Sequence, residues 1–147
     1  MKTLRLMLAG CAAAVALSCS VRASEWTEDY AAAQAQAKKE HKLILLDFTG
    51  SDWCGWCKKI DRDVFSTPKF KEFADKNLVL VTVDFPHNRP ISDAVKAQNK
   101  SLSDKYSVDG FPTLIVIDAD GKTVFQQVGY EEGGPEAFLA KFPKSGS

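Results

Sequence analysis

The chain has few of the residues that bind structural metals or build disulfide scaffolds. Its 147 residues include four cysteines and two histidines. A structural zinc site needs four ligands, and neither His41 nor His87 lies in a second ligand pair that could complement Cys54 and Cys57. A small protein held together by disulfides would carry more cysteine pairs. Both classes are therefore disfavoured, and one closely spaced cysteine pair remains to be explained.

An excess of charge of either sign is also lacking. The sequence contains 19 basic and 19 acidic residues, so its formal net charge is zero. The first 23 residues contain three of the basic residues and no acidic one, which leaves residues 24–147 with a small negative charge. Nucleic-acid binding is typical of a basic stripe or patch, and no such stripe emerges along this chain. We therefore expect no nucleic-acid partner.

The N-terminus carries an apolar run that is too short for a membrane span. Leu6–Leu17 follows two basic residues and has the length of a signal-peptide core. The small-residue pattern at 21–23 fits a cleavage site. We predict cleavage between Ala23 and Ser24.

This interpretation divides the chain into two parts. Residues 1–23 are predicted to be a signal peptide, and residues 24–147 are predicted to form one domain of ordinary size. The product would be periplasmic or secreted. An alternative is a lipoprotein anchored through Cys19, because the sequence before that cysteine partly matches a lipoprotein signal.

The hydrophobic pattern predicts an α/β domain. Helices are indicated over 26–41, 54–65, 68–77, 92–106 and 135–142, and strands over 43–48, 78–85, 108–118 and 122–129. Continuous apolar strands are typical of parallel sheets covered on both faces, whereas the "DADG" turn indicates an antiparallel hairpin. Thr27 is the expected cap of the first helix. We predict one mixed four-stranded sheet flanked by helices.

The cysteine pair lies where redox chemistry is favoured. Cys54 follows the first buried strand and begins a predicted helix, whose dipole would stabilise its thiolate. Cys57 lies three residues further on the same helical face, so it could resolve a mixed disulfide formed by Cys54. Haem attachment would need a histidine in place of Lys58. A structural bridge over so short a loop would stabilise little. A dithiol holding a soft metal such as copper(I) remains the alternative.

Two stretches carry a family resemblance. "LILLDFTGSDWCGWCK" (43–58) and "VDGFPT" (108–113) resemble the thioredoxin superfamily, especially its exported bacterial thiol:disulfide interchange proteins. The resemblance implies a thioredoxin fold and thiol–disulfide oxidoreductase activity, with Cys54 as the nucleophile and Cys57 as the resolving thiol. It further implies that Pro112 is a cis-proline and that the backbone of Phe111 pairs with the client chain. The dithiol would be the redox centre, without a further cofactor or metal.

Other residues near the motif have predicted roles. Asp47 is an acid inside an apolar strand, where burial would raise its pKa and suit it to exchange a proton with Cys57. The alternative for Asp47 is a strand end that faces water. Trp53, Gly55 and Trp56 are assigned to contact with a client peptide, although both tryptophans could instead be packing residues.

The sequence also departs from ordinary thioredoxin in ways that limit the inference. Asp47 lies one residue further from Cys54 than usual, which predicts a bulge within 49–52. The 86–105 segment is longer than in a minimal thioredoxin and would either add a lobe near the active site or lengthen a helix. Gly55-Trp56 replaces the usual glycine-proline, and this pair tunes the reduction potential.

The physiological role is inferred by analogy. We expect a reductase or isomerase direction, protein disulfide clients and a monomeric enzyme. Because the bacterial periplasm is kept oxidising, a reductase there would need a membrane electron donor.

Overall fold

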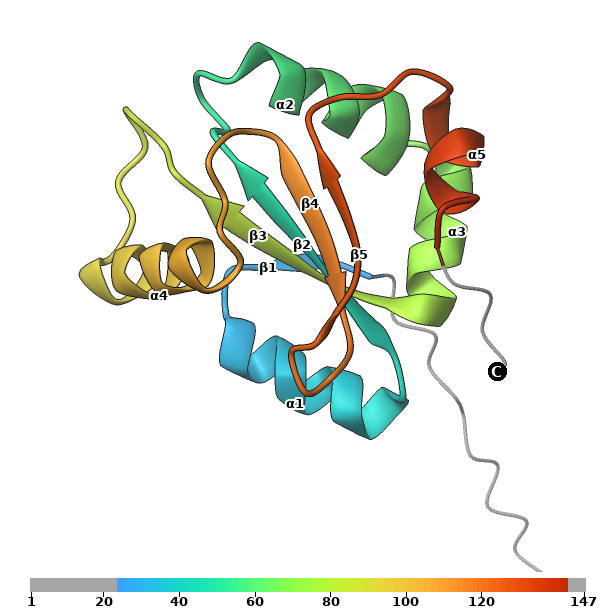
Figure 1. Ribbon diagram of the computed structural model, residues 1–147, viewed down its shortest axis with the longest axis horizontal. Helices are drawn as coiled ribbons and strands as arrows, with labels where there is room; N and C mark the ends of the chain where they lie inside the picture. Colours follow the sequence, from blue (N-terminus) through green and yellow to red (C-terminus); the bar gives the residue numbers. More distant parts are fainter. Residues whose placement is uncertain (1–23, 143–147) are drawn as a thin grey trace, which may run out of the picture.

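The computed structural model describes residues 24–142, which form a five-stranded sheet with helices on both faces (Figure 1). The predicted signal peptide and the alternative anchor at Cys19 lie outside the described residues. The strands, in chain order, are β1 (Trp26–Thr27), β2 (Leu43–Thr49), β3 (Leu78–Asp84), β4 (Thr113–Ile117) and β5 (Thr123–Val128). They lie side by side in the order β1-β3-β2-β4-β5. The predicted mixed α/β architecture is confirmed.

The prediction of four strands was wrong by one. Trp26 and Thr27 form β1, which pairs in parallel with Leu80 and Val81 of β3. The first helix therefore begins later than predicted, and Asp29 caps it in place of Thr27 by accepting a hydrogen bond of 2.9 Å from the backbone of Ala32. A two-residue strand exists only through its pairing with a distant strand, so the hydrophobic pattern does not reveal it.

The strand directions follow from the connections. β2 and β3 pair in parallel, as their right-handed helical crossover requires. β4 pairs antiparallel with both β2 and β5. The carboxyl ends of β2 and β3 therefore meet the amino end of β4 at one edge of the sheet. The register sets Thr49 beside Asp84 and Phe48 beside Thr113 at this edge.

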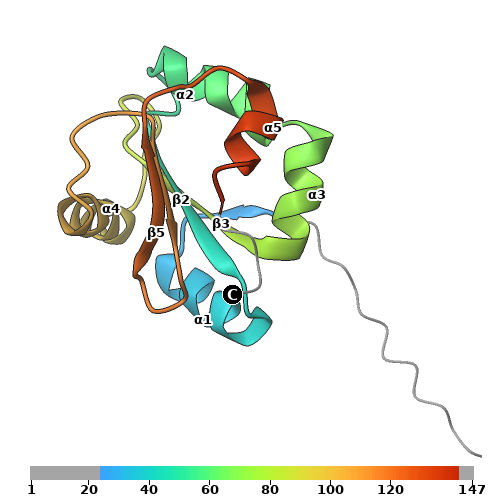
Figure 2. The same ribbon diagram turned by 45° about the vertical axis from the view of Figure 1, so that its right-hand side comes forward.

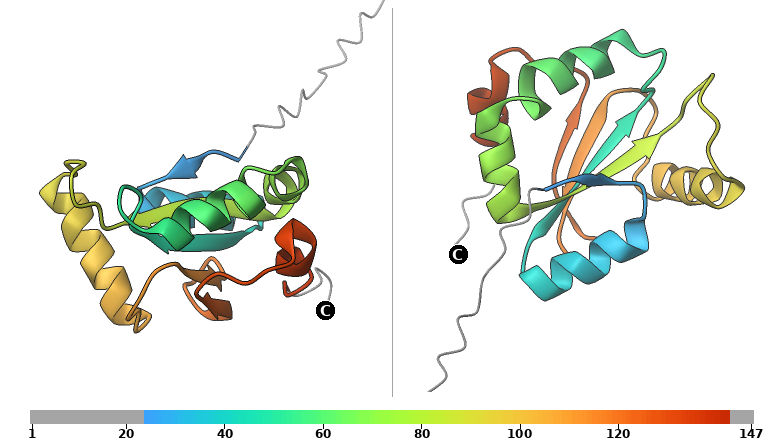
Figure 3. Two further views of the ribbon diagram at one scale, coloured as in Figure 1. Left: turned by 90° about the horizontal axis from the view of Figure 1, so that it is seen from above. Right: turned by 180° about the vertical axis from the view of Figure 1, so that it is seen from behind.

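The helices cover the two faces of the sheet unequally (Figures 2 and 3). They are α1 (Tyr30–Glu40), α2 (Gly55–Ile60), α3 (Pro68–Asn77), α4 (Asp93–Lys105) and α5 (Gly134–Leu139), and a π-helix, η1 (Asp61–Phe65), continues α2. Side chains alternate along β2, so Leu45 packs with Ile60 and Phe138 on the face of α2 and α5, whereas Ile44 packs with Ala33 and Leu102 on the face of α1 and α4. Each face thus has its own apolar core.

The predicted helix over 54–65 is not uniform. Its second half is the π-helix η1, in which the backbone N–H of Ser66 reaches the carbonyl of Asp61 at 2.8 Å. Wide turns of this kind are rare and often lie near functional sites. Five residues are too few for a hydrophobic pattern to distinguish the two helix types, so the sequence predicted a single α-helix.

Candidate active site

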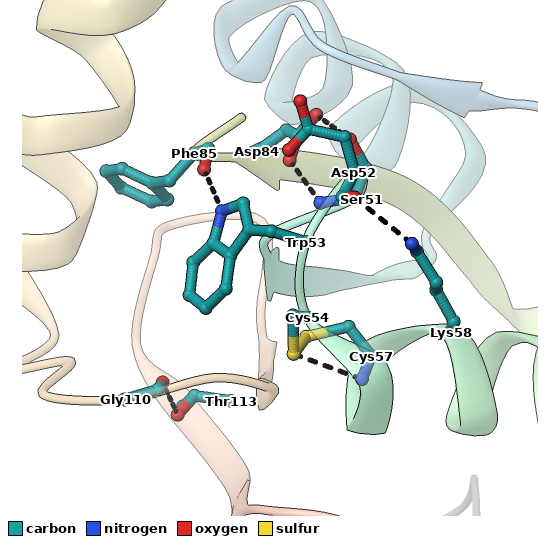
Figure 4. The surroundings of a disulfide bond; sticks show 10 residues. All are labelled: Ser51, Asp52, Trp53, Cys54, Cys57, Lys58, Asp84, Phe85, Gly110 and Thr113. Atoms are coloured by element: carbon teal, nitrogen blue, oxygen red, sulfur yellow. Dashed lines mark hydrogen bonds between the residues drawn. A yellow bond between two sulfur atoms is a disulfide. The ribbon is translucent and has the colours of Figure 1, made fainter. Parts of the chain in front are cut away.

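Three connecting segments meet at one end of the sheet, where the carboxyl ends of β2 and β3 lie beside the amino end of β4. Residues 50–54 leave β2, residues 85–92 leave β3, and residues 108–112 lead into β4. These segments lie far apart in the sequence, and the strand register brings them together. Figure 4 shows the side chains that they contribute around the cysteine pair. This edge is the candidate active site.

Cys54 and Cys57 form a disulfide, with their Cα atoms 5.3 Å apart. Both cysteines are buried, at 6% and 4% exposure. Cys54 lies at the N-cap of α2, where its Sγ accepts the backbone N–H of Cys57 at 3.2 Å (Figure 4). The same N–H and the helix dipole favour negative charge on Sγ once the disulfide is reduced. The geometry therefore suits Cys54 to act as a thiolate nucleophile.

Trp53 links the cysteine loop to the loop after β3. Its indole N–H donates a hydrogen bond of 2.8 Å to the carbonyl of Phe85, and its ring stacks on His87 with a centroid distance of 4.6 Å. The rings of Trp53 and Phe111 also meet nearly at right angles, with their centroids 5.9 Å apart. The indole lies directly over Gly50, where a Cβ atom would come within 2.4 Å of the ring. Trp53 is thus fixed in place yet remains 42% exposed beside the disulfide.

The residues before β4 adopt the conformation that the resemblance implied. The Phe111–Pro112 peptide bond is cis, and Pro112 is buried. The Thr113 hydroxyl closes this loop by donating to the carbonyl of Gly110 at 2.8 Å (Figure 4). On the other side, Gly129 donates its backbone N–H to the carbonyl of Pro112 at 2.8 Å. These contacts hold the loop at the same edge of the sheet as the disulfide.

Trp56 has different aromatic neighbours from Trp53 and is 61% exposed. It stacks on Tyr130, which follows β5, with a centroid distance of 5.7 Å. Tyr130 also donates to Asp63 at 3.0 Å and receives Lys59 over its ring at 4.7 Å. The sequence reasoning missed Tyr130, because no local motif connects it with the cysteines.

Asp47 lies within β2 and points to the face that α2 covers, since it follows Leu45 by two positions. Among the residues that the structure describes, its buried Oδ1 has no hydrogen-bond partner. Burial, with smaller contributions from the charges of Asp61 and Asp84, raises the pKa of Asp47 from 3.8 to about 8. The raised pKa agrees with the direction that the sequence predicted for an acid within an apolar strand, and it favours the protonated form of Asp47.

Two acidic residues, Asp52 and Asp84, hold the surrounding loops in place through hydrogen bonds. Neither residue was predicted from the sequence. Asp52 accepts backbone N–H bonds from His87, Asn88 and Arg89 at 2.9, 2.6 and 3.1 Å. These hydrogen bonds lower the pKa of Asp52. The carboxylate of Asp52 thereby fixes the loop after β3 against the cysteine loop.

Asp84 connects the cysteine loop and the loop after β3 through hydrogen bonds of its buried side chain. Its buried carboxylate accepts bonds from the Ser51 backbone and hydroxyl at 2.9 and 2.6 Å, and from Arg89 at 2.7 Å. The extra residue between Asp47 and the cysteines is part of a turn that begins at Gly50, whose carbonyl accepts from Cys54 at 2.8 Å. The predicted bulge was wrong, because this turn follows the end of β2 instead of interrupting its pairing.

A groove of about 680 Å³ opens beside Trp53, between the loop after β3 and α4. Phe85, Phe111 and Ile91 contribute apolar surface to it, and Lys96 and Lys100 of α4 contribute charge. The 86–105 segment contributes to the structure in two ways. It builds a 13-residue helix, and it forms a surface feature next to the active site.

Residues 24–142 contain neither a cluster of metal-binding side chains nor a membrane-spanning helix. No group of three or more histidine, cysteine, aspartate or glutamate side chains there is arranged to hold a metal ion. No helix within this range has the length and apolar character needed to cross a membrane.

The fold and the site define the class of protein: an α/β domain that presents a redox-active cysteine pair at the start of a helix, opposite a cis-proline. The family model described as "Thioredoxin-like domain" matches residues 30–144. The chain belongs to the thioredoxin-like family.

Individual relatives agree with this assignment. The disulfide bond reductase DsbH of Chlamydia pneumoniae is 42% identical over 117 residues, which make up 80% of this chain and 69% of that protein. The thiol:disulfide interchange protein DsbD of Photorhabdus laumondii is 33% identical over 91 residues, 62% of this chain but 14% of that protein. A solved structure of a DsbH oxidoreductase matches with a TM-score of 0.75 and 36% identity, over 95% of this chain and 91% of that chain. The chain is a thioredoxin-like thiol–disulfide oxidoreductase.

Proposed function

We propose that this chain is an exported disulfide reductase whose mature domain comprises residues 24–147. The observation that carries the proposal is the position of Cys54 at the start of α2, with the Cys57 N–H on its sulfur. The similarity to a protein named as a disulfide bond reductase supports the direction. The dithiol is the redox centre, and we propose no further cofactor. No observation in the described residues favours the copper(I) alternative.

The proposed reaction moves two electrons from the dithiol to a client disulfide. The Cys54 thiolate attacks one client sulfur, which forms a mixed disulfide and releases the other client sulfur as a thiol after it takes up a proton. Cys57 then loses its proton and attacks the Cys54 sulfur, which releases the second client thiol. The enzyme ends with the Cys54–Cys57 disulfide that the structure contains.

Asp47 is the proposed proton acceptor for Cys57. It lies on the sheet face beneath α2, and burial raises its pKa to about 8 in the disulfide form. A carboxylate that accepts the Cys57 proton during resolution would therefore keep that proton in the oxidised enzyme. When a donor reduces the disulfide, the same proton can return to the departing Cys57 sulfur.

The client chain is proposed to bind around the disulfide. Phe111 would offer its backbone to an extended client strand, while Pro112 holds that segment in place. Trp53 and Trp56 would flank the client with exposed rings. Gly55 has no atom within 4 Å of the position of a Cβ, so the surface between the tryptophans is open to an approaching chain.

The reduction potential tests the direction of electron flow. The purified protein would be equilibrated in thiol–disulfide buffers while the fluorescence of Trp53 and Trp56 reports its redox state. A potential near about −270 mV, as in thioredoxin, supports a reductase, whereas one near about −120 mV would overturn the direction in favour of a disulfide-forming oxidant.

The proposed partners and location require a separate test. We propose protein disulfide clients, a membrane electron donor and a monomeric enzyme in the periplasm or outside the cell. The mass of the protein recovered from an exporting bacterium would show cleavage between Ala23 and Ser24. A lipid-modified Cys19 at the new N-terminus would instead establish the anchored alternative.

A further inference from the structure

The groove beside Trp53 has an aromatic wall that continues directly from the active site. Phe85 and Phe111 contact each other at a centroid distance of 5.2 Å, and Phe111 lies against Trp53 in a T-shaped arrangement. Trp53 precedes the nucleophilic Cys54 in the chain, and Phe111 precedes the cis-proline. Any polypeptide joined to Cys54 in a mixed disulfide therefore has this wall within reach.

The opposite wall of the groove is cationic. Lys96 and Lys100 line it from successive turns of α4, and Arg89 lines it from the loop after β3. The acid that lines the groove is Asp84, which is 1% exposed and already bound to Arg89 at 2.7 Å. Arg89 also binds Glu28 at 2.6 Å, so two carboxylates balance its charge, and the accessible positive charge on the groove walls comes from Lys96 and Lys100.

Lys96 and Lys100 form only weak ion pairs with their neighbouring carboxylates. Lys96 meets Asp93 at 3.3 Å and Lys100 meets Asp104 at 2.7 Å, but these carboxylate side chains are 100% and 66% exposed. Ion pairs exposed to this degree contribute little free energy. Both ammonium groups can therefore turn to a carboxylate that enters the groove.

We propose that this groove is a client subsite that selects polypeptides with an aromatic or large aliphatic side chain followed by acidic residues. The apolar side chain would pack against Phe85, Phe111 and Trp53, and the acidic residues would meet Lys96 and Lys100. The volume of about 680 Å³ exceeds what a single side chain fills and lies within the range of specific binding pockets. The inference deepens the proposed function and rests on it.

The test uses peptides that differ only in the residues assigned to the groove. Each peptide carries one cysteine in a mixed disulfide with 2-mercaptoethanol, and it presents Phe-Glu-Glu, Phe-Lys-Lys or Ala-Glu-Glu on the same side of that cysteine. The rate constant for oxidation of the reduced protein is measured by tryptophan fluorescence. We expect the Phe-Glu-Glu peptide to react about fivefold faster than either of the others, and its advantage over Phe-Lys-Lys to shrink as salt is raised.

Charge-reversed variants assign the effect to the groove. In Lys96→Glu/Lys100→Glu, the preference between Phe-Glu-Glu and Phe-Lys-Lys should invert. The matched control is Lys69→Glu/Lys76→Glu on α3, where two equally exposed lysines also pair with surface acids on the far side of the molecule (Figure 1). The control should keep the original preference. Each preference is a ratio of two rate constants measured on the same variant. A partial loss of folded protein lowers both rates equally and cancels from this ratio.

The outcomes separate this inference from the proposed function. Bis(2-hydroxyethyl) disulfide has no groups for the groove, so the reduced protein and both variants should react with it at equal rates. Reaction with this disulfide but no preference among the peptides would overturn the subsite and leave the reductase in place. An inverted preference in the α3 variant would also overturn the subsite, because the selection would then follow net charge. Failure to react with any disulfide would overturn the exchange function itself.

Discussion

The backbone N–H of Cys57 points at the sulfur of Cys54, 3.2 Å away, inside the same disulfide-bonded pair. One turn of α2 thus supplies both the group that stabilises the attacking sulfur and the sulfur that later resolves the mixed disulfide. The two cysteines have different roles because the helix begins between them: Cys54 caps α2, and Cys57 lies inside it.

This asymmetry predicts different outcomes for the two cysteine variants. Cys57→Ser should accumulate mixed disulfides between Cys54 and client proteins, because attack still occurs but resolution does not. Cys54→Ser should accumulate few, since the remaining Cys57 lies inside α2 and lacks the N-cap position that stabilises the thiolate of Cys54. Non-reducing electrophoresis of both variants, expressed in an exporting bacterium, distinguishes them. Equal trapping by the two variants would contradict the assigned order of attack.

The buried carboxyl of Asp47 predicts a dependence of stability on pH. Its pKa is raised from 3.8 to about 8 in the folded protein, so the unfolded chain releases this proton near pH 4 and the folded chain near pH 8. Stability contributed by the neutral carboxyl is therefore lost as pH rises through this window. Between pH 5 and pH 8, the free energy of unfolding of the oxidised protein should fall. This fall should exceed that of the oxidised Asp47→Asn variant by on the order of 3 kcal/mol.

Denaturant unfolding of both oxidised proteins at several pH values measures this difference. All other titrating groups are shared, so their contributions cancel in the comparison. Parallel profiles for the two proteins would show that Asp47 does not hold its proton in the folded state. A resolving step that slows in Asp47→Asn while the attack by Cys54 keeps its rate would further support proton transfer from Cys57.

The close approach of Trp53 to Gly50 predicts a sensitive position outside the motif. In Gly50→Ala, the new Cβ would lie 2.4 Å from the indole, so Trp53 must move away. It would lose its hydrogen bond to Phe85 and its stacking on His87, at a cost of about 1 kcal/mol in unfolding free energy. A changed tryptophan emission spectrum would report the movement.

Gly110→Ala is the matched control for this prediction. A Cβ at Gly110 meets no atom within 4 Å, although the residue lies at the same edge of the sheet. Its emission spectrum and stability should resemble those of the unchanged protein. If Gly50→Ala also resembles the unchanged protein, Trp53 is not held as the structure shows.

The carboxylate of Asp52 predicts a local effect on the loop after β3. Asp52→Asn removes the charge that accepts the backbone N–H groups of His87, Asn88 and Arg89. Hydrogen exchange at these three amides should accelerate, while exchange in β2 and β3 should stay slow. These hydrogen bonds make the pKa of Asp52 lower in the folded protein than in the unfolded chain. The protection of the three amides should therefore be complete above the pKa of Asp52 in the unfolded chain. It should disappear as pH falls through the pKa of Asp52 in the folded protein.

Glu72→Gln provides the comparison, since it removes an exposed carboxylate that binds only Lys76 within α3. It should leave exchange in the 87–89 loop unchanged. Equal rates at the three amides in Asp52→Asn and the unchanged protein would mean that another group holds the loop.

Several features could be predicted because they depend on neighbouring residues. The apolar runs indicated β2 and β3, and the spacing of Cys54 and Cys57 indicated a redox pair at a helix start. The cis bond before Pro112 was implied by the family resemblance and is present in the structure. The apolar setting of Asp47 within its strand indicated the raised pKa. Apart from the cis bond, the determining residues in these cases lie within a few positions of one another.

What only the tertiary structure decided is the surroundings of the cysteine pair. Asp52 and His87 are 35 residues apart in the chain, and Trp56 and Tyr130 are still further apart, yet both pairs are in contact. Their meeting depends on the register of parallel and antiparallel strands, which no local pattern encodes. The sequence by itself thus indicated the chemistry, because the spacing of the two cysteines and their position at a predicted helix start are local features. The groove, the loop network and the fifth strand required the folded sheet, because they are built from contacts between distant segments.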